Sequence, residues 1–310
     1  MRVAVVDIGT NSTRLLVADV DADTHVVTEL ERRSTVTRLG QGVDASGGLA
    51  PEPMQRVFAT LADYRHAMDE HGVTANIAVL TSAVRDAANG PDFTARVRDE
   101  FGLNARTLSG DEEAQTTFLG ATSSRDPDAS APVVVIDIGG GSTEFIVGNH
   151  DDVRFHVSTQ AGVVRMGERH VHTDPPAPEE LQDVTDDVRT VFGDALPDEV
   201  QRDVQAGIAV AGTATSAAAI AQELDPYDPT RVHGYRLAQP VLQEMLARLA
   251  AMTEEERRHV PGLHPDRAPT IVPGVILLLE AMRAFGLPEV EVSEHDILRG
   301  AALKLATGAF

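Results

Sequence analysis

The chain has 310 residues, which is more than one ordinary hydrophobic core accommodates and favours two domains. Hydrophobic residues make up 42% and charged residues 24%, a globular composition that excludes disordered, collagen-like and coiled-coil proteins. The net charge of −22 opposes binding to nucleic acid and anionic membranes, and the absence of cysteine excludes disulfides, thiol nucleophiles and cysteine-ligated metals.

The pattern of the first residues predicts a short strand and not a signal peptide. Residues 1–7 reach an aspartate before an apolar run of signal-peptide length can form, and no later run has the length of a transmembrane helix. We therefore expect a cytoplasmic protein. Lys304 is the only lysine, so lysine-dependent phosphate loops and Schiff-base chemistry are disfavoured. Arginine or backbone amides would have to hold any bound anion.

One pattern occurs twice. Residues 3–18 and 133–148 each combine an apolar run that ends in aspartate, a turn rich in Gly, Ser and Thr, and a second apolar run. Each copy predicts a β-hairpin at the start of an α/β lobe, so we expect two lobes related by a pseudo-two-fold duplication, with an interlobe cleft. The polar segment 122–132, which contains two prolines, predicts lobes at 1–124 and 125–310.

Strands and helices alternate after each hairpin. Apolar spacing predicts, in chain order, a helix at 52–70, a strand at 77–80 and helices at 91–101, 112–121, 178–192, 241–252 and 275–285. It also predicts strands at 208–211 and 290–292 and a last helix at 295–305. This terminal segment, about 295–310, is a candidate to pack back on the first lobe. Segments 226–237 and 261–273, rich in Pro, Gly and His, are predicted as loops.

The two turns carry the groups that a phosphate site needs. Glycine lets the backbone approach an anion, and hydroxyl and amide groups donate to its oxygens. The candidate substrate-binding residues are Asp7, Gly9, Thr10, Asn11, Ser12 and Arg14 in the first copy, and Gly139, Gly140, Gly141, Ser142 and Thr143 in the second. Turn geometry alone would explain one copy, but two copies with the same Asp-Ile-Gly-x-x-Ser-Thr spacing favour phosphate binding.

The two copies differ at one charged position. Arg14 follows Asp7, whereas Glu144 stands at the equivalent place after Asp137. An acid in one copy and a base in the other predict that Asp137 and Glu144 hold Mg²⁺ or another divalent cation and that Arg14 binds phosphate. The alternative is that Glu144 and Arg14 form an ion pair with each other.

Two predicted helix starts offer further polar groups. Ser109 and Glu112 have capping-box spacing, which gives Glu112 a structural role and leaves Glu113 near the positive end of the helix. Glu113 is a candidate general base, although a second solvated acid explains it equally well. Gly212 and Thr213 end a strand and open a helix, where backbone amides bind an anion or only form a cap.

The motifs resemble those of the exopolyphosphatase and guanosine pentaphosphate phosphohydrolase (Ppx/GppA) family of the actin-like ATPase superfamily. The resemblance covers nearly the whole chain, because further family motifs follow in order at 81–89, 108–114, 164–169, 211–216, 232–234, 261–267 and 293–298. In length the chain is similar to the family's short actinobacterial-type form. The resemblance implies two actin-like (ribonuclease H-like) lobes, a divalent cation such as Mg²⁺ and a homodimer.

The resemblance also implies roles for single residues. The family's catalytic glutamate falls on Glu113, and its motif places Arg85 on the transferred phosphoryl group. Arg165 and Arg267 are candidates to bind inner phosphates, although each arginine could equally belong to a surface ion pair. The implied reaction releases orthophosphate from the end of inorganic polyphosphate.

Three alternatives stay open. Guanosine pentaphosphate would be the substrate of a 5′-phosphohydrolase of the same family, and guanosine penta- or tetraphosphate could also act as an inhibitor. A kinase would transfer phosphate from ATP to a hydroxyl, and a non-catalytic sensor would only bind polyphosphate or an alarmone. Gly167 stands where the family commonly has threonine, and Ala268 and Pro269 replace a usual Ala-Asp. Both departures bear on substrate choice more than on hydrolysis.

Overall fold

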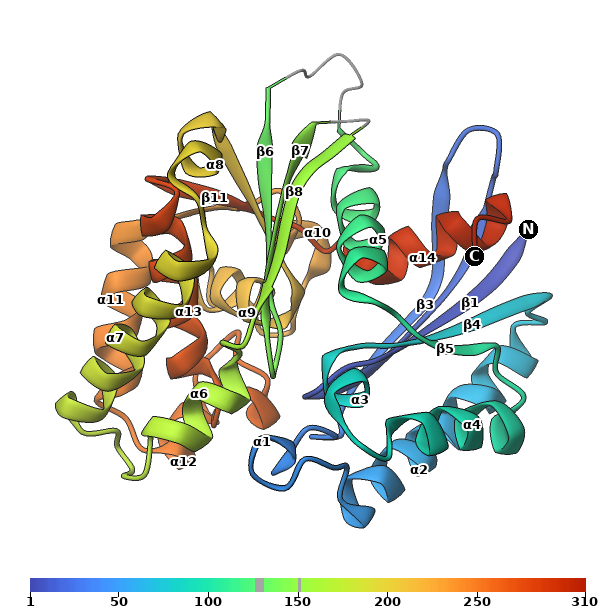
Figure 1. The fold of residues 1–310 in the computed structure, drawn as a ribbon, viewed down its shortest axis with the longest axis horizontal. Coiled ribbons are helices and arrows are strands. Elements are labelled where there is room, and N and C mark those ends of the chain that lie inside the picture. The colour runs from blue at the N-terminus through green and yellow to red at the C-terminus, as the bar shows by residue number, and fades with distance from the viewer. Residues whose placement is uncertain (126–130, 150–151) are drawn as a thin grey trace. The chain divides into compact units, whose positions relative to one another are not determined.

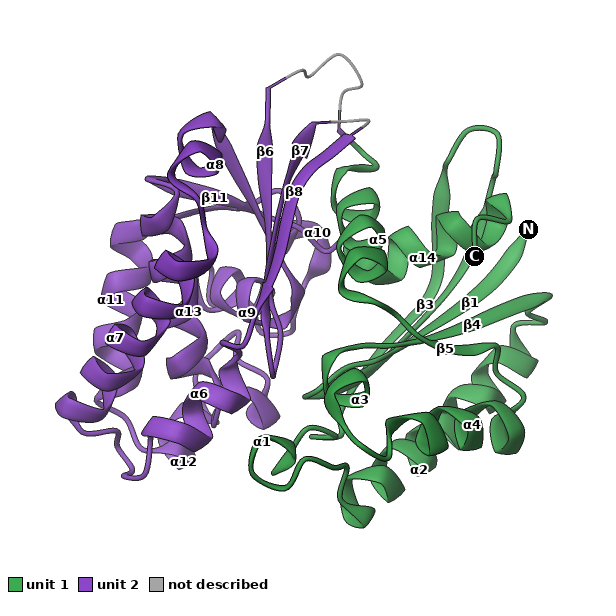
Figure 2. Cartoon of the chain, in the orientation of Figure 1, with its two compact units in different colours: residues 1–124, 295–310 green, residues 125–294 purple. Residues whose placement is uncertain are grey.

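The structure is a computed structural model that describes residues 1–125, 131–149 and 152–310. Its contacts divide the chain into two compact units (Figure 2). Unit 1 comprises residues 1–124 and 295–310, and unit 2 comprises residues 125–294. The last helix therefore belongs to the same unit as the N-terminal hairpin. Residues 126–130, from the predicted boundary segment, lie outside the described residues.

Unit 1 contains a five-stranded sheet with the order β3-β2-β1-β4-β5. Its strands are β1 (Arg2–Ile8), β2 (Ser12–Val20), β3 (Val27–Val36), β4 (Ala75–Leu80) and β5 (Ala105–Thr107). The first three are antiparallel neighbours, and β4 and β5 continue the sheet parallel to β1. Its helices are α1 (Val43–Ser46), α2 (Pro51–Glu70), α3 (Ser82–Asp86), α4 (Gly90–Phe101), α5 (Gly110–Thr122) and α14 (Ile297–Thr307).

Both faces of this sheet are covered. On β1, Ala4, Val6 and Ile8 belong to a core that includes α2 and α4, whereas Val3 and Val5 belong to a second core with α14 (Figure 1). A strand buried on both sides has no polar face, and this explains the continuous apolar run at the N-terminus. No helix in the described ranges is long and apolar enough to cross a membrane.

Unit 2 contains a six-stranded sheet with the order β10-β11-β9-β6-β7-β8. Its strands are β6 (Val133–Ile138), β7 (Thr143–Asn149), β8 (Asp152–Thr159), β9 (Ala206–Val210), β10 (Arg236–Ala238) and β11 (Glu289–Val292). Its helices are α6 (Val163–His170), α7 (Pro178–Ala195), α8 (Asp198–Asp203), α9 (Ala211–Ala221), α10 (Pro229–Val232), α11 (Gln239–Ala250), α12 (Glu254–Arg257), η1 (Pro265–Arg267) and α13 (Ile271–Ala284). Apart from β10, the strand order repeats that of unit 1, so the predicted α/β class is confirmed.

Both predicted hairpins are confirmed, and each pairs with a third strand that the sequence analysis missed. Both strands, β3 and β8, lie at sheet edges. Most residues of β3 are polar, so this strand lacks an apolar signal, whereas Val153, Phe155 and Val157 of β8 alternate with polar residues as in an amphipathic strand. The two predicted loops are partly wrong. Segment 226–237 contains α10 and the start of β10, and α13 begins within 261–273, because its apolar face is buried from the first turn onward.

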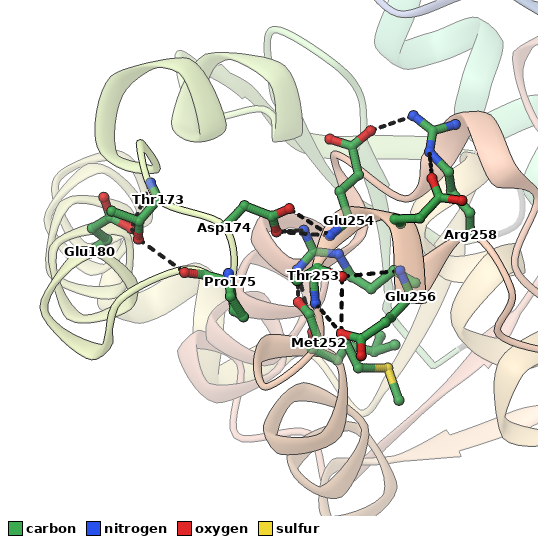
Figure 3. A network of polar contacts seen from close by, with 12 residues as sticks. Thr173, Asp174, Pro175, Glu180, Met252, Thr253, Glu254, Glu256 and Arg258 are labelled. Carbon is green, nitrogen blue, oxygen red and sulfur yellow. Dashed lines mark hydrogen bonds and ion pairs between the residues drawn. The ribbon is translucent and has the colours of Figure 1, made fainter.

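Polar contacts connect the segment before α7 to α12 (Figure 3). The carboxylate of Asp174 accepts a hydrogen bond of 2.8 Å from the backbone N–H of Glu254, at the start of α12. Glu180 accepts bonds from the Thr173 hydroxyl at 2.7 Å and the Ala177 N–H at 2.9 Å. These donors stabilise the ionised carboxylate and lower the pKa of Glu180 to about 2. The hydrogen bond from the Thr173 hydroxyl contributes most to this shift.

Replacing Glu180 should therefore destabilise unit 2 in a pH-dependent way. Because the folded pKa lies below the unfolded one, the carboxylate stabilises the fold above about pH 4.5, and this contribution is lost as the pH falls towards 2. The thermal midpoint of Glu180→Gln should lie below that of the wild type at neutral pH, and the gap should narrow towards about pH 3.5. Scanning calorimetry at several pH values measures the gap, and a gap independent of pH would contradict this role.

Candidate active site

The end of β1 carries a buried cluster of charges. The β1–β2 register places Asp7 opposite Arg14. The Arg14 guanidinium donates to Asp7 Oδ2 from Nε at 2.9 Å and from Nη2 at 2.6 Å, and its Nη1 donates to Asp296 Oδ2. Asp296 also caps α14, since its Oδ1 accepts from the Leu298 N–H at 3.0 Å. One arginine thus joins the N-terminal hairpin to the terminal helix.

The two aspartates respond differently to this arrangement. Burial raises the pKa of Asp7, and the negative charge of Asp296 adds to the rise while Arg14 offsets part of it. Burial also opposes ionisation of Asp296, but the guanidinium groups of Arg14 and Arg32 outweigh it and keep that pKa below its usual range. No role was predicted for Asp296. It is the second residue of the predicted last helix, 295–305, whereas α14 begins only at Ile297 and leaves Asp296 at the N-cap.

The turn between β1 and β2 is closed by a hydrogen bond of 3.0 Å from the Gly9 N–H to the Ser12 carbonyl. The Thr10 hydroxyl lies 3.0 Å from the hydroxyl of Ser82, at the start of α3. Two buried atoms of this segment, Asp7 Oδ1 and Asn11 Nδ2, have no hydrogen-bond partner among the described residues. Buried polar atoms normally have partners, so these two mark the turn as a place where ligand or water supplies them.

Glu113 and Arg85 form an ion pair. Arg85 Nη1 donates to Glu113 Oε2 at 2.6 Å and to the Leu108 carbonyl at 3.1 Å. The predicted capping box is confirmed, because Ser109 Oγ accepts from the Glu112 N–H and Glu112 Oε2 accepts from the Ser109 N–H. Glu113 is only 8% exposed, so its interpretation as a solvated acid is wrong. Arg85 lies on α3, the short helix that follows β4.

The surroundings of Glu113 favour its protonated form. Burial raises the pKa of Glu113, the charge of Arg85 offsets part of the rise, and the carboxylates of Asp7 and Asp86 add to it. A carboxylate with a raised pKa accepts a proton more readily near neutral pH than an exposed glutamate does. Glu113 therefore stays a candidate general base.

The turn between β6 and β7 repeats the closure of the first turn, with a bond of 3.0 Å from the Gly139 N–H to the Ser142 carbonyl. The start of α6 is fixed on this turn: the Gly140 carbonyl accepts from the Val164 N–H at 2.8 Å, and Arg165 Nε donates to the Gly141 carbonyl at 2.9 Å. The predicted phosphate contact Arg165 is thus placed at the predicted phosphate turn.

Asp137 and Glu144 lie opposite each other on β6 and β7. Glu144 is buried, and its Oε1 accepts a bond of 2.7 Å from the Ser158 hydroxyl. Two carboxylates in register on neighbouring strands repel each other unless a cation lies nearby, and oxygen ligands of this kind suit Mg²⁺. No cluster of three or more His, Asp or Glu side chains in the described ranges forms a complete metal cage. A cation here would take its other ligands from water and substrate.

The β9–α9 junction brings two predicted residues together. Arg267, from η1, lies against Gly212 so closely that a Cβ on Gly212 would be 2.0 Å from Arg267 Nη1. Thr213 Oγ1 donates to the Ile138 carbonyl at 3.4 Å, which connects α9 to the end of β6. Ala211 has a φ of +62°, a left-handed conformation that is rare for alanine. Strain of this kind concentrates at functional sites.

Gly212→Ala should displace the Arg267 guanidinium without unfolding the protein. The three atoms nearest to the new methyl group all belong to the end of the flexible Arg267 side chain, and Gly212 is not among the glycines with positive φ. If Arg267 binds phosphate, the variant should raise KM for a polyphosphate about tenfold, as Arg267→Gln should. Steady-state kinetics compares both with Gly193→Ala, whose methyl group meets nothing within 4 Å. An unchanged KM in both variants would remove Arg267 from substrate binding.

The predicted residues thus form two groups, one in each unit. The group in unit 1 contains Asp7, Gly9, Thr10, Asn11, Ser12, Arg14, Arg85 and Glu113. The group in unit 2 contains Asp137, Gly139, Gly140, Gly141, Ser142, Thr143, Glu144, Arg165, Gly212, Thr213 and Arg267. Each group lies at the carboxyl ends of the central strands, where ligands of α/β sheets bind. The predicted interlobe cleft stays a prediction.

Comparison with known proteins decides the family. A family model described as the Ppx/GppA phosphatase family matches residues 16–305. The chain belongs to this family. Exopolyphosphatase 2 of Mycobacterium tuberculosis is 39% identical to this Ppx/GppA chain, with 98% of each covered. Exopolyphosphatase 1 of the same organism is 28% identical, with 98% of this chain and 88% of the relative covered.

Solved structures of Ppx/GppA proteins have the same fold. A crystal structure of an exopolyphosphatase-like protein is 30% identical and superposes with a TM-score of 0.91 over 100% of both chains. An exopolyphosphatase from Cytophaga hutchinsonii is 26% identical, with a TM-score of 0.88 over 99% of this chain and 98% of that one. The Aquifex aeolicus family member is 28% identical, with a TM-score of 0.82 and coverages of 100% and 98%. The predicted two-lobed actin-like fold is confirmed.

Proposed function

We propose that this protein is an exopolyphosphatase, which hydrolyses the terminal phosphoanhydride bond of inorganic polyphosphate and releases orthophosphate. The observation that carries the proposal is Glu113, a buried carboxylate with a raised pKa held 2.6 Å from Arg85. Relatives named exopolyphosphatase, which align over nearly the whole chain, support the choice of substrate.

In this proposal, the residues of unit 1 perform the water chemistry. Glu113 accepts a proton from a water molecule as the water oxygen bonds to the terminal phosphorus. The bond from that phosphorus to the bridging oxygen breaks, and the shortened polyphosphate leaves with the electron pair. The Arg85 charge beside Glu113 stabilises the negative charge on the transferred phosphoryl group, and the turn around Thr10 and Asn11 donates hydrogen bonds to phosphate oxygens.

We also propose a divalent cation, Mg²⁺ in the first instance, held by Asp137 and Glu144. Their chemistry fits the ion, because both are carboxylates in register and Glu144 is fixed by Ser158. When bound, the cation neutralises charge on phosphate oxygens. Ser142, Gly212 and the two arginines Arg165 and Arg267 would hold further phosphates of the substrate. The predicted contact from Thr143 is wrong, because this residue is fully buried and its hydroxyl donates to the Ala161 carbonyl at 2.6 Å. A homodimer and a cytoplasmic location stay predictions.

The test is phosphate release from short and long polyphosphate, guanosine pentaphosphate and ATP, each with Mg²⁺ and with a chelator. We expect Mg²⁺-dependent release from polyphosphate that exceeds release from the two nucleotides. Faster release from guanosine pentaphosphate at matched concentration would replace the proposed substrate by the nucleotide. Folded protein that binds polyphosphate and releases no phosphate would replace the enzyme by a sensor.

A further inference from the structure

The segment after β3 lies along the first phosphate turn. The Asn11 carbonyl accepts bonds from the backbone N–H groups of Thr37 at 3.0 Å and Arg38 at 2.8 Å, and the Gly40 N–H donates to the Thr10 carbonyl at 2.8 Å. The approach is so close that a Cβ on Gly40 would lie 2.2 Å from Thr10 Cγ2. The backbone of Arg38 is therefore held directly beside the turn.

Arg38 has an unusual backbone conformation. Its φ is +51°, one of four positive values among the non-glycine residues that the structure describes. This left-handed region is unfavourable for a long side chain, and such strain persists only where the surroundings impose it. Here the two bonds to Asn11 and the contact at Gly40 impose it. A second strained residue, Ala211, stands next to Gly212 in the other predicted phosphate segment.

The Arg38 side chain differs from those of neighbouring arginines because it has no polar partner among the described residues. It is exposed and makes no hydrogen bond or ion pair with any described residue. Nearby arginines of unit 1 are paired: Arg32 with Glu29 at 2.7 Å, Arg33 with Glu31 at 2.5 Å and Arg56 with Glu52 at 3.1 Å. In a chain with a net charge of −22, an exposed arginine whose backbone is fixed beside the predicted phosphate turn offers a local positive charge to a ligand.

We propose that Arg38 is a substrate-binding residue that donates to phosphate oxygens of a polyphosphate anion held at the β1–β2 turn. A guanidinium matches two phosphate oxygens at once and stays charged at any physiological pH. The buried Asn11 Nδ2, which has no hydrogen-bond partner among the described residues, lies in the turn itself and offers a second donor. The inference deepens the proposed function and rests on it for the identity of the ligand.

Arg38→Gly is the decisive variant, because glycine removes the guanidinium and tolerates a positive φ. Its thermal midpoint should equal or exceed that of the wild type, while KM for tripolyphosphate should rise about tenfold or more with kcat nearly unchanged. Arg38→Asn also tolerates this conformation and should give the same result, and Arg38→Lys should lose less affinity. A wild-type KM in both Arg38→Gly and Arg38→Asn overturns the inference.

Arg248→Gln is the matched control, since Arg248 is also exposed and has no hydrogen-bond or ion-pair partner among the described residues, but lies on α11 in unit 2. It should keep the wild-type KM, and an equal rise there would overturn the inference by showing that any surface arginine matters.

Calorimetric titration of tripolyphosphate into Glu113→Gln, with chelator present, gives a readout independent of turnover. Adding Arg38→Gly should weaken binding about tenfold. If the wild-type protein hydrolyses no polyphosphate but Arg38→Gly still weakens binding, the proposed function is refuted and Arg38 is supported as an anion ligand. Unchanged binding alongside normal hydrolysis would refute the role of Arg38 alone.

Discussion

Glu113→Gln is expected to lower kcat for polyphosphate by about 10²- to 10⁴-fold, the range that a general base contributes. Glutamine has nearly the same size and still accepts a hydrogen bond from Arg85, so the ion-pair partner remains satisfied while the proton acceptor is lost. The variant should fold normally and retain polyphosphate binding. Phosphate release under saturating substrate measures kcat, and calorimetric titration measures binding.

Glu112→Gln is the matched control for this result. It is the adjacent glutamate on the same helix turn, but its carboxylate bonds to the Ser109 N–H, and glutamine also forms a capping box. Its kcat should stay close to that of the wild type. Equal losses in both variants would indicate a general effect on α5, and near wild-type turnover in Glu113→Gln would remove Glu113 from the role of base.

The dependence of kcat on pH tests the same role of Glu113. A general base works only when it is ionised, so kcat should fall as the pH drops through the pKa of Glu113. Burial raises that pKa, so the fall should begin at a higher pH than an exposed glutamate would produce. The residual activity of Glu113→Gln should lack this acidic limb.

Gly300→Ala is expected to destabilise the protein by about 3 kcal/mol, as overpacking against an immovable backbone does. A Cβ on Gly300 would lie 1.8 Å from the Thr116 carbonyl oxygen, and one on Gly120 would lie 1.9 Å from that of Asp296. These two glycines let α14 and α5 touch through their backbones. Neither helix can move away without disturbing the core beneath them, where Leu298 and Ala301 are fully buried against β1 and β2.

Gly193→Ala should change stability in the opposite direction. It is the same substitution in the interior of α7, but its methyl group meets nothing within 4 Å, so alanine should stabilise the helix by about 0.5–1 kcal/mol. Urea denaturation of both variants measures the difference.

Because Asp296 precedes α14 and contacts Arg14, Gly300→Ala should also lower kcat at temperatures where it is still folded. A Gly300→Ala protein as stable as the wild type would contradict the close helix contact.

Short-range patterns were enough to predict much of the fold. The two copies of Asp-Ile-Gly-x-x-Ser-Thr predicted both hairpins, because apolar strands and glycine turns are specified within about fifteen residues. The capping box at Ser109 separated Glu112 from Glu113 for the same reason, since its two hydrogen bonds join residues three apart. The edge strand β3 was not predicted because it is mostly polar and its pairing depends on the neighbouring strand. The alternation of Val153, Phe155 and Val157 was a local signal for β8 that the prediction overlooked.

The charged cluster depended instead on how the chain folds over long distances. Arg14 meets Asp296 across 282 residues because α14 returns to the first unit, and no local pattern specifies that return. Arg38 has no motif of its own, and it lies beside the phosphate turn only because the segment after β3 pairs with Asn11. Hydrogen bonds between close neighbours follow from residue types and spacing. Contacts between distant residues require the sheet of that unit and its helices to pack first, and only the tertiary structure supplies that packing.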